Sequence, residues 1–520
     1  MNHTLSSEKK RRLVYGAVFL GIMSVYLLRA TASGLWFDEA IEYYFSSTLR
    51  GPVPGARSDY SMYRRILITY QPPLYNWLMY GWLQLGDSEF WFRLAGILVT
   101  FLGGAGLYLG LKEIMDQAWA AAGGAVYLLA GGVSRYALEA GEYNLAMCMI
   151  CWTLCFYLLA LKREKTGPLL GFFVFACLAA YSQYGTVFLI VPMYLSLLIH
   201  FVKQRKKLGA LFFFSLLAAA AAVPLVVYFL LPQMRLQGSD SVSHVPVFVN
   251  GVIDPLVSLA KTAAFTFKDK TRLQFAAAVA AGALALTALR GKNKLWFHIL
   301  FLFFCSWMSY YLITACTIYG YNGTYNPDTV GTANIGGRYS LAFAPLLTAA
   351  LVYGVYCACT RKPEKEGALS GKKLTAAALC LFIAYSAIGV GSILATQKKD
   401  DVREATQVWY AQEAYNSRTL VNQWDDPLFQ FYLTHSPDYA EEYQQSIHRA
   451  PWWGDGNPEQ IETTLSGLGL LDAEDFYYIS KASEDYEDHY HTFIQTVTGL
   501  GFAVEEPYHG ASALIHAVKK

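Results

Sequence analysis

The sequence contains few charged residues, and this scarcity excludes several classes of protein. Lys, Arg, Asp and Glu make up 15% of the 520 residues, whereas apolar residues make up 54%. A soluble domain usually carries about 25% charged residues. The formal net charge is only +2, and the basic residues cluster in short loops. The composition therefore argues against a nucleic-acid partner and favours a protein that lies largely within membrane lipids.

The C-terminal region lacks cysteine and lacks any glycine-rich phosphate loop followed by a helix. All nine cysteines lie between Cys148 and Cys380, in or beside apolar segments. This distribution argues against a disulfide framework or a zinc site. From Asp401 to Lys520 there are twenty acidic residues against six basic ones. A nucleotide site is not predicted in this acidic region.

Long apolar runs are abundant, and most approach the roughly 20 residues that a helix needs to cross a bilayer. The eleven predicted spans are residues 13–33, 93–111, 118–133, 143–161, 167–182, 184–201, 209–231, 273–289, 295–314, 339–359 and 373–395. The strongly basic short loops all fall on the side of the N-terminal block Lys9–Arg12, which the positive-inside rule places in the cytoplasm. An odd number of spans then puts the C-terminal region outside. The long first span has no clear small-residue cleavage site, which argues against a cleavable signal peptide.

Two domains are predicted, a transmembrane domain over residues 1–398 and an acidic extracytoplasmic domain over residues 399–520. The acidic domain alternates helical and strand-like patterns. Helices are predicted at 402–416, 457–467 and 482–498, and strands at 418–422, 475–480, 501–505 and 512–518. The fold class is therefore a polytopic α-helical membrane protein, with about eleven transmembrane helices and a C-terminal α/β domain.

Some outer segments are too long to be simple turns, and such segments are usually functional. They are residues 34–92, 232–272 and 315–338. In the first of them, Ile41, Tyr44, Phe45 and Thr48 share one face at helical spacing. Pro72 and Pro73 can open a further helix, which carries Tyr75. These helices are expected to lie at the membrane interface and to wall a site there.

An acidic pair, Asp38 and Glu39, follows the first apolar span directly. A carboxylate pair at a bilayer surface is costly unless it is solvated, paired or used. The predicted topology places this pair, and with it candidate chemistry, on the outer face. No cofactor is assigned, and a divalent metal near the acidic pair is left open.

Several motifs occur together in an order and spacing that resemble one known family. They are Trp36–Ala40, Gln71–Tyr75, Gly86–Phe90 with Arg93–Leu94, Ser134–Tyr143 and Gly337–Tyr339. Over roughly residues 30–360 the chain resembles bacterial membrane glycosyltransferases related to protein O-mannosyltransferases and lipid A aminoarabinose transferases. The resemblance implies the GT-C fold, a polyprenyl-phosphate-linked sugar donor and an envelope lipid, glycan or protein as acceptor. It also implies an inverting transfer at the outer face of the bacterial plasma (inner) membrane.

Such a transfer requires a base for the acceptor and cationic or hydrogen-bonding groups for the departing phosphate. Asp38 is the candidate base, with Glu39 positioning the acceptor or the helix. The alternative is that Asp38 caps an interfacial helix through its carboxylate. A second carboxylic acid to protonate the leaving group is not obligatory, because a phosphate leaves readily.

A second acidic motif contains Glu139 and Glu142, which are predicted to share one helical face with Arg135 at i, i+4 and i+7. The family pattern has an acidic residue followed two positions later by Arg, and this chain has Gly141 at that second position. Glu139 is therefore predicted to be catalytic, and Arg135 to supply the missing charge from one turn earlier. A plain salt bridge at the membrane surface is the alternative.

The candidates for binding the donor phosphate begin with Arg338 and Tyr339, because a guanidinium can hold phosphate oxygens with two hydrogen bonds. Snorkelling of Arg338 at a helix end is the alternative. Gln71 stands where relatives often carry Lys or His, and it can still donate a hydrogen bond. Further positive charges on the predicted outer side come from Arg64, Arg65, Lys268, Lys270 and Arg272.

A transporter or flippase for a lipid-linked substrate is the alternative function. Transporters place their charges near the bilayer midplane and often contain paired broken helices, whereas the charges of this chain gather at outer helix ends. A sensor whose acidic domain binds an external ligand is a third interpretation, which would leave the elaborate first outer segment without a role.

Overall fold

The structure is a computed structural model. It describes residues 7–49, 60–237, 253–267, 294–315, 338–360, 371–395, 401–451, 457–482 and 487–520. The chain forms two compact units, which we call the helical unit and the sheet unit. The helical unit comprises Met1–Arg29, Ile66–Leu78 and Arg93–Thr396, and the sheet unit comprises Ala30–Arg65, Met79–Phe92 and Gln397–Lys520. The predicted domain boundary between residues 398 and 399 lies outside the described residues.

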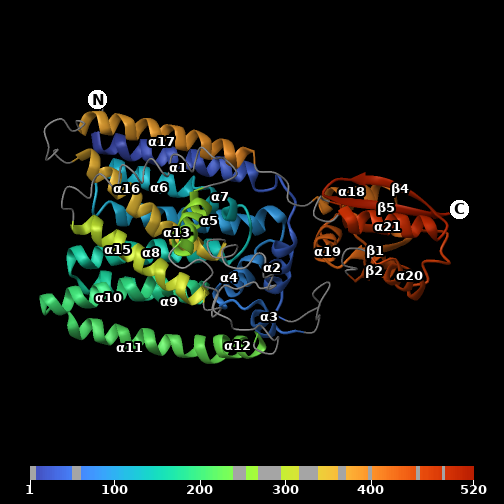
Figure 1. The fold of residues 1–520 in the computed structure, drawn as a ribbon, viewed down its shortest axis with the longest axis horizontal. Coiled ribbons are helices and arrows are strands. Elements are labelled where there is room, and N and C mark those ends of the chain that lie inside the picture. The colour runs from blue at the N-terminus through green and yellow to red at the C-terminus, as the bar shows by residue number, and fades with distance from the viewer. Residues whose placement is uncertain are drawn as a thin grey trace. The chain divides into compact units, whose positions relative to one another are not determined.

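Helices account for nearly all of the described residues before the C-terminal sheet. They are α1 (Ser7–Arg29), α2 (Phe37–Ser47), α3 (Met62–Thr69), α4 (Leu74–Leu83), α5 (Glu89–Leu111), α6 (Gln117–Leu128), α7 (Gly131–Ala137), α8 (Glu142–Arg163), α9 (Thr166–Ser182), α10 (Val187–Gln204), α11 (Leu208–Pro224), α12 (Leu231–Gln237), α13 (Ile253–Phe267), α15 (Lys294–Ala315), α16 (Ala344–Thr360) and α17 (Gly371–Leu394). Three shorter turns of helix are η1 (Tyr184–Thr186), η2 (Leu225–Leu230) and η4 (Arg338–Phe343). Within the helical unit, the long helices run alongside one another (Figure 1).

Seven helices in the described part of the chain are long and apolar enough to cross a membrane. They are Glu89–Leu111, Glu142–Arg163, Tyr184–Gln204, Leu208–Leu236, Lys294–Thr314, Arg338–Thr360 and Lys373–Leu394. Leu13–Arg29 and Thr166–Ser182 are shorter apolar helices at two further predicted spans. The chain is thus a multi-pass membrane protein. The predicted span 273–289 lies outside the described residues.

The prediction of one continuous span over residues 118–133 is wrong. Helix α6 ends at Leu128, and Ala130 has an extended backbone with φ −66° and ψ 131° before α7 begins at Gly131. The apolar run continues across this break, so hydropathy alone could not detect it.

Close packing between α5 and α8 explains why small residues recur in these two helices. A Cβ atom added to Gly110 of α5 would lie 2.8 Å from the Cα of Cys155, and one added to Gly103 would lie 3.0 Å from the Cα of Cys148. Both cysteines are buried. Small residues of this kind let two helices in a membrane approach closely. This close packing fixes α8 against α5. The first residue of α8, Glu142, belongs to the candidate site.

The sheet unit contains a five-stranded mixed sheet with the order β2-β1-β3-β5-β4. The strands are β1 (Arg418–Asn422), β2 (Ile447–Ala450), β3 (Asp475–Lys481), β4 (Phe502–His509) and β5 (Ser512–Lys519). The longer helices among them are α18 (Val402–Ala411), α19 (Asp426–Thr434), α20 (Pro458–Gly467) and α21 (Glu487–Gly499). β1 pairs in parallel with β2 and β3, and β5 pairs antiparallel with β3 and β4. Parallel neighbours need crossover connections, which α19 and α20 provide.

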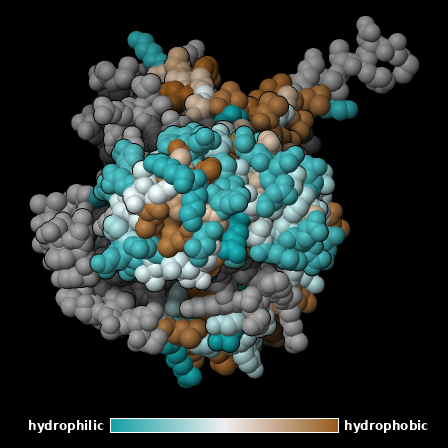
Figure 2. Space-filling view, turned by 90° about the vertical axis from the view of Figure 1, so that its right-hand side faces the viewer, coloured by the Kyte–Doolittle hydropathy of each residue, from teal (hydrophilic) through white to brown (hydrophobic). Residues whose placement is uncertain are grey.

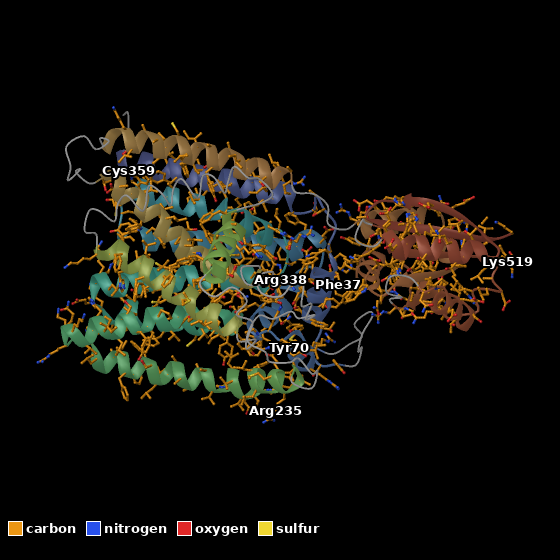
Figure 3. The ribbon with its side chains drawn as sticks, viewed as in Figure 1. Phe37, Tyr70, Arg235, Arg338, Cys359 and Lys519 are labelled. Atoms are coloured by element: carbon orange, nitrogen blue, oxygen red, sulfur yellow. The ribbon has the colours of Figure 1, made fainter. Side chains whose placement is uncertain are left out.

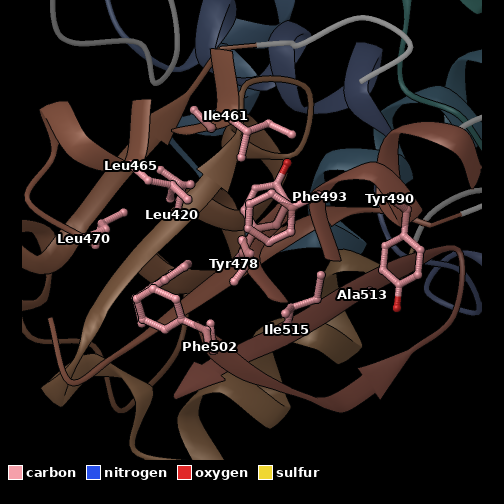
Figure 4. Close-up of a cluster of buried hydrophobic side chains, with 14 residues drawn as sticks. Leu420, Ile461, Leu465, Leu470, Tyr478, Tyr490, Phe493, Phe502, Ala513 and Ile515 are labelled. Atoms are coloured by element: carbon pink, nitrogen blue, oxygen red, sulfur yellow. The ribbon is translucent and has the colours of Figure 1, made fainter. Parts of the chain in front are cut away.

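The core of this sheet joins residues from the strands to residues from α20 and α21 (Figure 4). Its largest members include Leu420, Ile461, Tyr478, Phe493 and Phe502. The face of the C-terminal domain that Figure 2 shows is mainly hydrophilic. This contrast of a dry core and a polar surface is the pattern of a water-exposed domain, and the predicted C-terminal domain with a β-sheet is confirmed.

Helices α2, α3 and α4 confirm that the described part of the first outer segment is helical. The buried residues of α2 are Glu39, Ala40, Glu42, Tyr43, Phe45 and Ser46. Of the residues predicted to share one face, Phe45 is buried, Ile41 and Tyr44 are partly exposed, and Thr48 lies beyond the end of the helix. The location of this face at the membrane interface stays a prediction.

Candidate functional site

The predicted site residues divide between the two units. Arg135, Glu139, Glu142, Arg338 and Tyr339 belong to the helical unit, together with Gln71 and Tyr75. Asp38, Glu39, Arg64 and Arg65 belong to the sheet unit. Each set is described by itself.

Charged and aromatic residues from three elements come together in the helical unit. Arg135 of α7 donates from Nε to Glu139 Oε1 at 3.2 Å, and its side chain is 46% exposed against 10% for Glu139. Tyr136 lies within electrostatic reach of Arg135, Glu139, Glu142 and Arg338. Two positive and two negative side chains are therefore close enough to act on a single tyrosine. We call Tyr136 and these four residues the Tyr136 cluster.

The Tyr136 cluster is built across a break between helices, which corrects the prediction of one shared helical face. Helix α7 ends at Ala137, and α8 begins at Glu142 after an extended Gly141 with φ 177°. Glu139 lies in the connection, while the buried Glu142 is the first residue of α8. A carboxylate at this position is stabilised by the positive end of the helix dipole.

Arg338 and Tyr339 enter the same cluster from η4, 196 residues after Glu142 in the chain (338 − 142). Arg338 is labelled in Figure 3. Its guanidinium carbon lies 5.5 Å from the centroid of the Tyr339 ring. The Tyr339 ring lies 6.2 Å from that of Tyr143, which lies 5.0 Å from the Tyr136 ring. A row of aromatic rings thus connects Arg338, which was predicted to bind the donor phosphate, with Arg135, which was predicted to supply a second positive charge.

Gln71 lies in the connection between α3 and α4, directly after Tyr70, whose φ of 56° makes the turn sharp. The Gln71 carbonyl accepts a hydrogen bond from Gln233 Nε2 at 2.8 Å. Its side-chain Oε1 is buried and, among the described residues, has no hydrogen-bond partner. Tyr75, on the first turn of α4, is also buried, with 6% of its surface exposed. The backbone at Gln71 is therefore fixed, while its amide oxygen retains capacity for a ligand.

Gln183 is a further candidate for ligand binding that the sequence analysis did not identify. The sequence indicated only that Gln183 lies in a very short turn. It is 4% exposed, and neither its Nε2 nor its Oε1 has a hydrogen-bond partner within the described ranges. Gln183 directly precedes η1, which contacts η4, the element that begins with Arg338. Buried polar atoms almost always have partners, so this amide is a candidate for binding a ligand group or a water molecule.

In the sheet unit, Asp38 and Glu39 occupy the first turn of α2. Glu39 is 1% exposed, and its Oε2 accepts a hydrogen bond from the Trp36 backbone N–H at 3.2 Å. Asp38 is half-buried. Glu39 thus makes a capping bond at the start of α2, and Asp38 is the more accessible of the two carboxylates.

Arg65 holds the end of α2. Its Nη1 donates to the carbonyl oxygens of Tyr44 and Thr48, at 3.0 and 3.2 Å, and to the Thr48 hydroxyl at 3.1 Å. Burial lowers the pKa of the Arg65 guanidinium from its usual range. These bonds satisfy carbonyls at the C-terminal end of the helix, which lack partners within it. Arg64 instead stacks over the Tyr60 ring, with 3.7 Å between its guanidinium carbon and the ring centroid.

Metal-binding geometry is absent from the described part of the chain, in which no group of three or more His, Cys, Asp or Glu side chains could hold an ion. Lys268, Lys270 and Arg272 lie outside the described residues. The contribution of these three positive charges to phosphate binding stays a prediction.

Comparison with known families gives a match over the part of the chain that contains the three middle motifs. Residues 70–231 match the family of dolichyl-phosphate-mannose-protein mannosyltransferases. The predicted resemblance to GT-C glycosyltransferases is confirmed. No curated protein matches the chain.

Solved structures of ArnT have the same architecture over nearly the whole chain. ArnT from Cupriavidus metallidurans in the apo state superimposes with a TM-score of 0.56 at 13% identity, covering 98% of each chain. The same protein bound to undecaprenyl phosphate gives a TM-score of 0.50 at 12% identity, again covering 98% of each chain. The apo oligosaccharyltransferase of Archaeoglobus fulgidus gives 0.49 at 11% identity, covering 94% of this chain and 73% of that one. At such identities the likeness establishes the fold alone.

Proposed function

We propose that this GT-C protein transfers a sugar from a polyprenyl-phosphate-linked donor to an envelope lipid, glycan or protein. The observation that carries the proposal is the Tyr136 cluster. Residues from two family motifs far apart in the sequence, one ending at Tyr143 and the other containing Arg338 and Tyr339, lie together there. A pair of arginines among aromatic rings suits a phosphate next to a sugar, because guanidinium binds phosphate and rings pack against sugar faces.

The proposed reaction is a single displacement with inversion. Asp38 removes the proton from the acceptor hydroxyl or amine as that atom attacks the anomeric carbon. The bond from this carbon to the phosphate oxygen breaks, and its electron pair leaves on the polyprenyl phosphate. Arg338 and Tyr339 hold the departing phosphate, with Gln71, Arg64 and Arg65 as further contacts. Glu139 supports catalysis through Arg135, and Tyr75 and Glu142 wall the site.

The deciding experiment offers the purified protein a panel of undecaprenyl-phosphate sugars and acceptors in detergent micelles. No sealed compartment exists in micelles, so transport has no meaning there. We expect release of free undecaprenyl phosphate together with a glycosylated acceptor. Binding of these lipids without release, across the whole panel, would favour a transporter or flippase over a transferase.

The proposed location of the chemistry is the extracytoplasmic side of the bacterial plasma membrane, with a cytoplasmic N-terminus. Reporter fusions after Arg163, Lys207 and Lys292 should therefore report the cytoplasm. Fusions after Asp240 and Asp455 should report the outside, because the proposed topology counts α6 and α7 together as one broken span, which keeps an odd number of spans before the acidic domain. A cytoplasmic signal at Asp455 would contradict chemistry on the outer face.

A further inference from the structure

Two side chains from the C-terminal helices hold the short segment that leads into α2. The Leu35 backbone N–H donates to the hydroxyl of Tyr432, on α19, at 2.5 Å. Arg403, on α18, donates from Nη1 to the Thr31 carbonyl oxygen at 3.0 Å. Both bonds reach the backbone just before the helix that carries Asp38. The acidic C-terminal domain therefore binds the backbone of the segment that precedes this helix.

Glu89 joins the two contacts into one network. Its Oε2 accepts hydrogen bonds from the Tyr432 hydroxyl and from Arg403 Nη1, each at 3.3 Å. Burial alone would lower the pKa of Arg403, but the carboxylates of Glu89 and Glu404 outweigh it and raise this pKa. The guanidinium therefore stays charged. Only 22% of the Arg403 side chain and 11% of the Glu89 side chain are exposed, so solvent screens this ion pair less than a surface pair.

The side of α2 is fixed by a second set of contacts with the same domain. The Tyr43 hydroxyl lies 3.1 Å from His435 Nε2, and His435 Nδ1 lies 2.7 Å from the Phe431 carbonyl oxygen. A carbonyl only accepts, so Nδ1 carries a hydrogen, and Nε2 faces both the Tyr43 hydroxyl and Asp87 Oδ2, which lies 3.7 Å away. The Tyr43 ring packs edge-on against Phe431 with 4.9 Å between centroids, and Phe37 packs against Trp424 at the same distance.

We propose that Tyr432, Arg403 and His435 are positioning residues that make the C-terminal domain a scaffold for the catalytic base. This inference rests on the proposed function, in which Asp38 is that base. Asp38 follows Leu35 by three residues. A shift of the segment from Thr31 to Leu35 would therefore move the first turn of α2. A base works only within hydrogen-bond reach of the proton it removes, and a displacement of about 1 Å can cost a hundredfold in rate.

The test compares Tyr432→Phe with Tyr410→Phe in the full-length protein. The first variant keeps the ring and removes the hydroxyl that holds Leu35 and Glu89. The second removes a hydroxyl that donates to the Leu433 carbonyl at 3.0 Å, so its bond joins α18 to α19 inside the C-terminal domain. Tyr432→Phe should speed hydrogen exchange of the α2 amides roughly fivefold or more, as expected for a lost buried hydrogen bond.

The kinetic part of the test uses the undecaprenyl-phosphate sugar that the micelle assay selects. Tyr432→Phe should lower kcat about tenfold and change the donor KM less than about twofold, because it disturbs alignment and not donor binding. Tyr410→Phe should change neither α2 exchange nor kcat. Should Tyr432→Phe fold poorly, Tyr43→Phe gives the same test, since it removes the bond to His435 while keeping the ring.

Unchanged α2 exchange in both Tyr432→Phe and Tyr43→Phe would overturn the scaffold role. Faster α2 exchange with an unaltered kcat would keep the scaffold role but overturn the role of these residues in positioning the base. A wild-type protein that releases no undecaprenyl phosphate would instead overturn the proposed function. That failure is distinguishable, because the exchange measurement does not depend on any donor.

Discussion

Asp38→Asn is expected to lower sugar transfer at least about a hundredfold, the lower end for loss of a positioned general base. The substitution removes the proton acceptor and keeps the size of the side chain. Thermal stability should stay near that of the wild type, because the bond from the Trp36 N–H at the start of α2 goes to Glu39 and is kept. Release of undecaprenyl phosphate in micelles measures the rate, and a melting curve in the same detergent measures the stability.

Glu39→Ala is the comparison, since it removes a neighbouring carboxylate, and with it the acceptor of the Trp36 N–H, from the same turn of α2. Loss of this bond by the buried Glu39 should act mainly on the stability of the helix start, by about 0.5–2 kcal/mol. The two variants should therefore separate, with rate affected most in one and stability in the other. Near-normal turnover by Asp38→Asn would remove Asp38 from the catalytic mechanism.

The sequence predicted those features whose signal is long or periodic. Seven membrane helices follow from apolar runs of sufficient length. Strands β1, β3, β4 and β5 follow from short β-branched and aromatic runs bounded by turns. Strand β2 was missed because its four residues, Ile447–Ala450, include a histidine and an arginine and form a short edge. Helix α19 was missed because its aromatic run has no clear helical period.

The candidate site was predicted as a set of residues and not as a geometry. The motifs identified Arg135, Glu139 and Arg338, yet the break before Gly141 that brings Glu139 out of a helix gave no sequence signal. The hydrogen bonds between the C-terminal domain and the segment before α2 could not be predicted either, because Leu35 and Tyr432 are 397 positions apart. Hydrogen bonds between such distant residues depend on the tertiary fold, which single-sequence patterns do not encode.

The second large effect is expected at Arg338, which the proposal assigns to the donor phosphate. Its guanidinium lies beside the Tyr339 ring and within electrostatic reach of Tyr136 and Tyr143. A snorkelling arginine at a helix end would interact with any anionic headgroup, whereas a built phosphate site would prefer the polyprenyl phosphate. The identity of the anion that stabilises the protein therefore separates the two interpretations.

Undecaprenyl phosphate, which retains the phosphate of the donor after transfer, is expected to raise the melting temperature of the purified wild-type protein. Nucleotide sugars should have no effect. Arg338→Ala should weaken the binding of undecaprenyl phosphate by about 10- to 150-fold, because loss of a charge-assisted contact typically costs roughly 1.5–3 kcal/mol. The matched control is Arg235→Ala, which removes an equal charge from an exposed position on α12 (Figure 3). Equal loss of stabilisation in both variants would show that only the general positive charge attracts the lipid, and Arg338 would return to a snorkelling role.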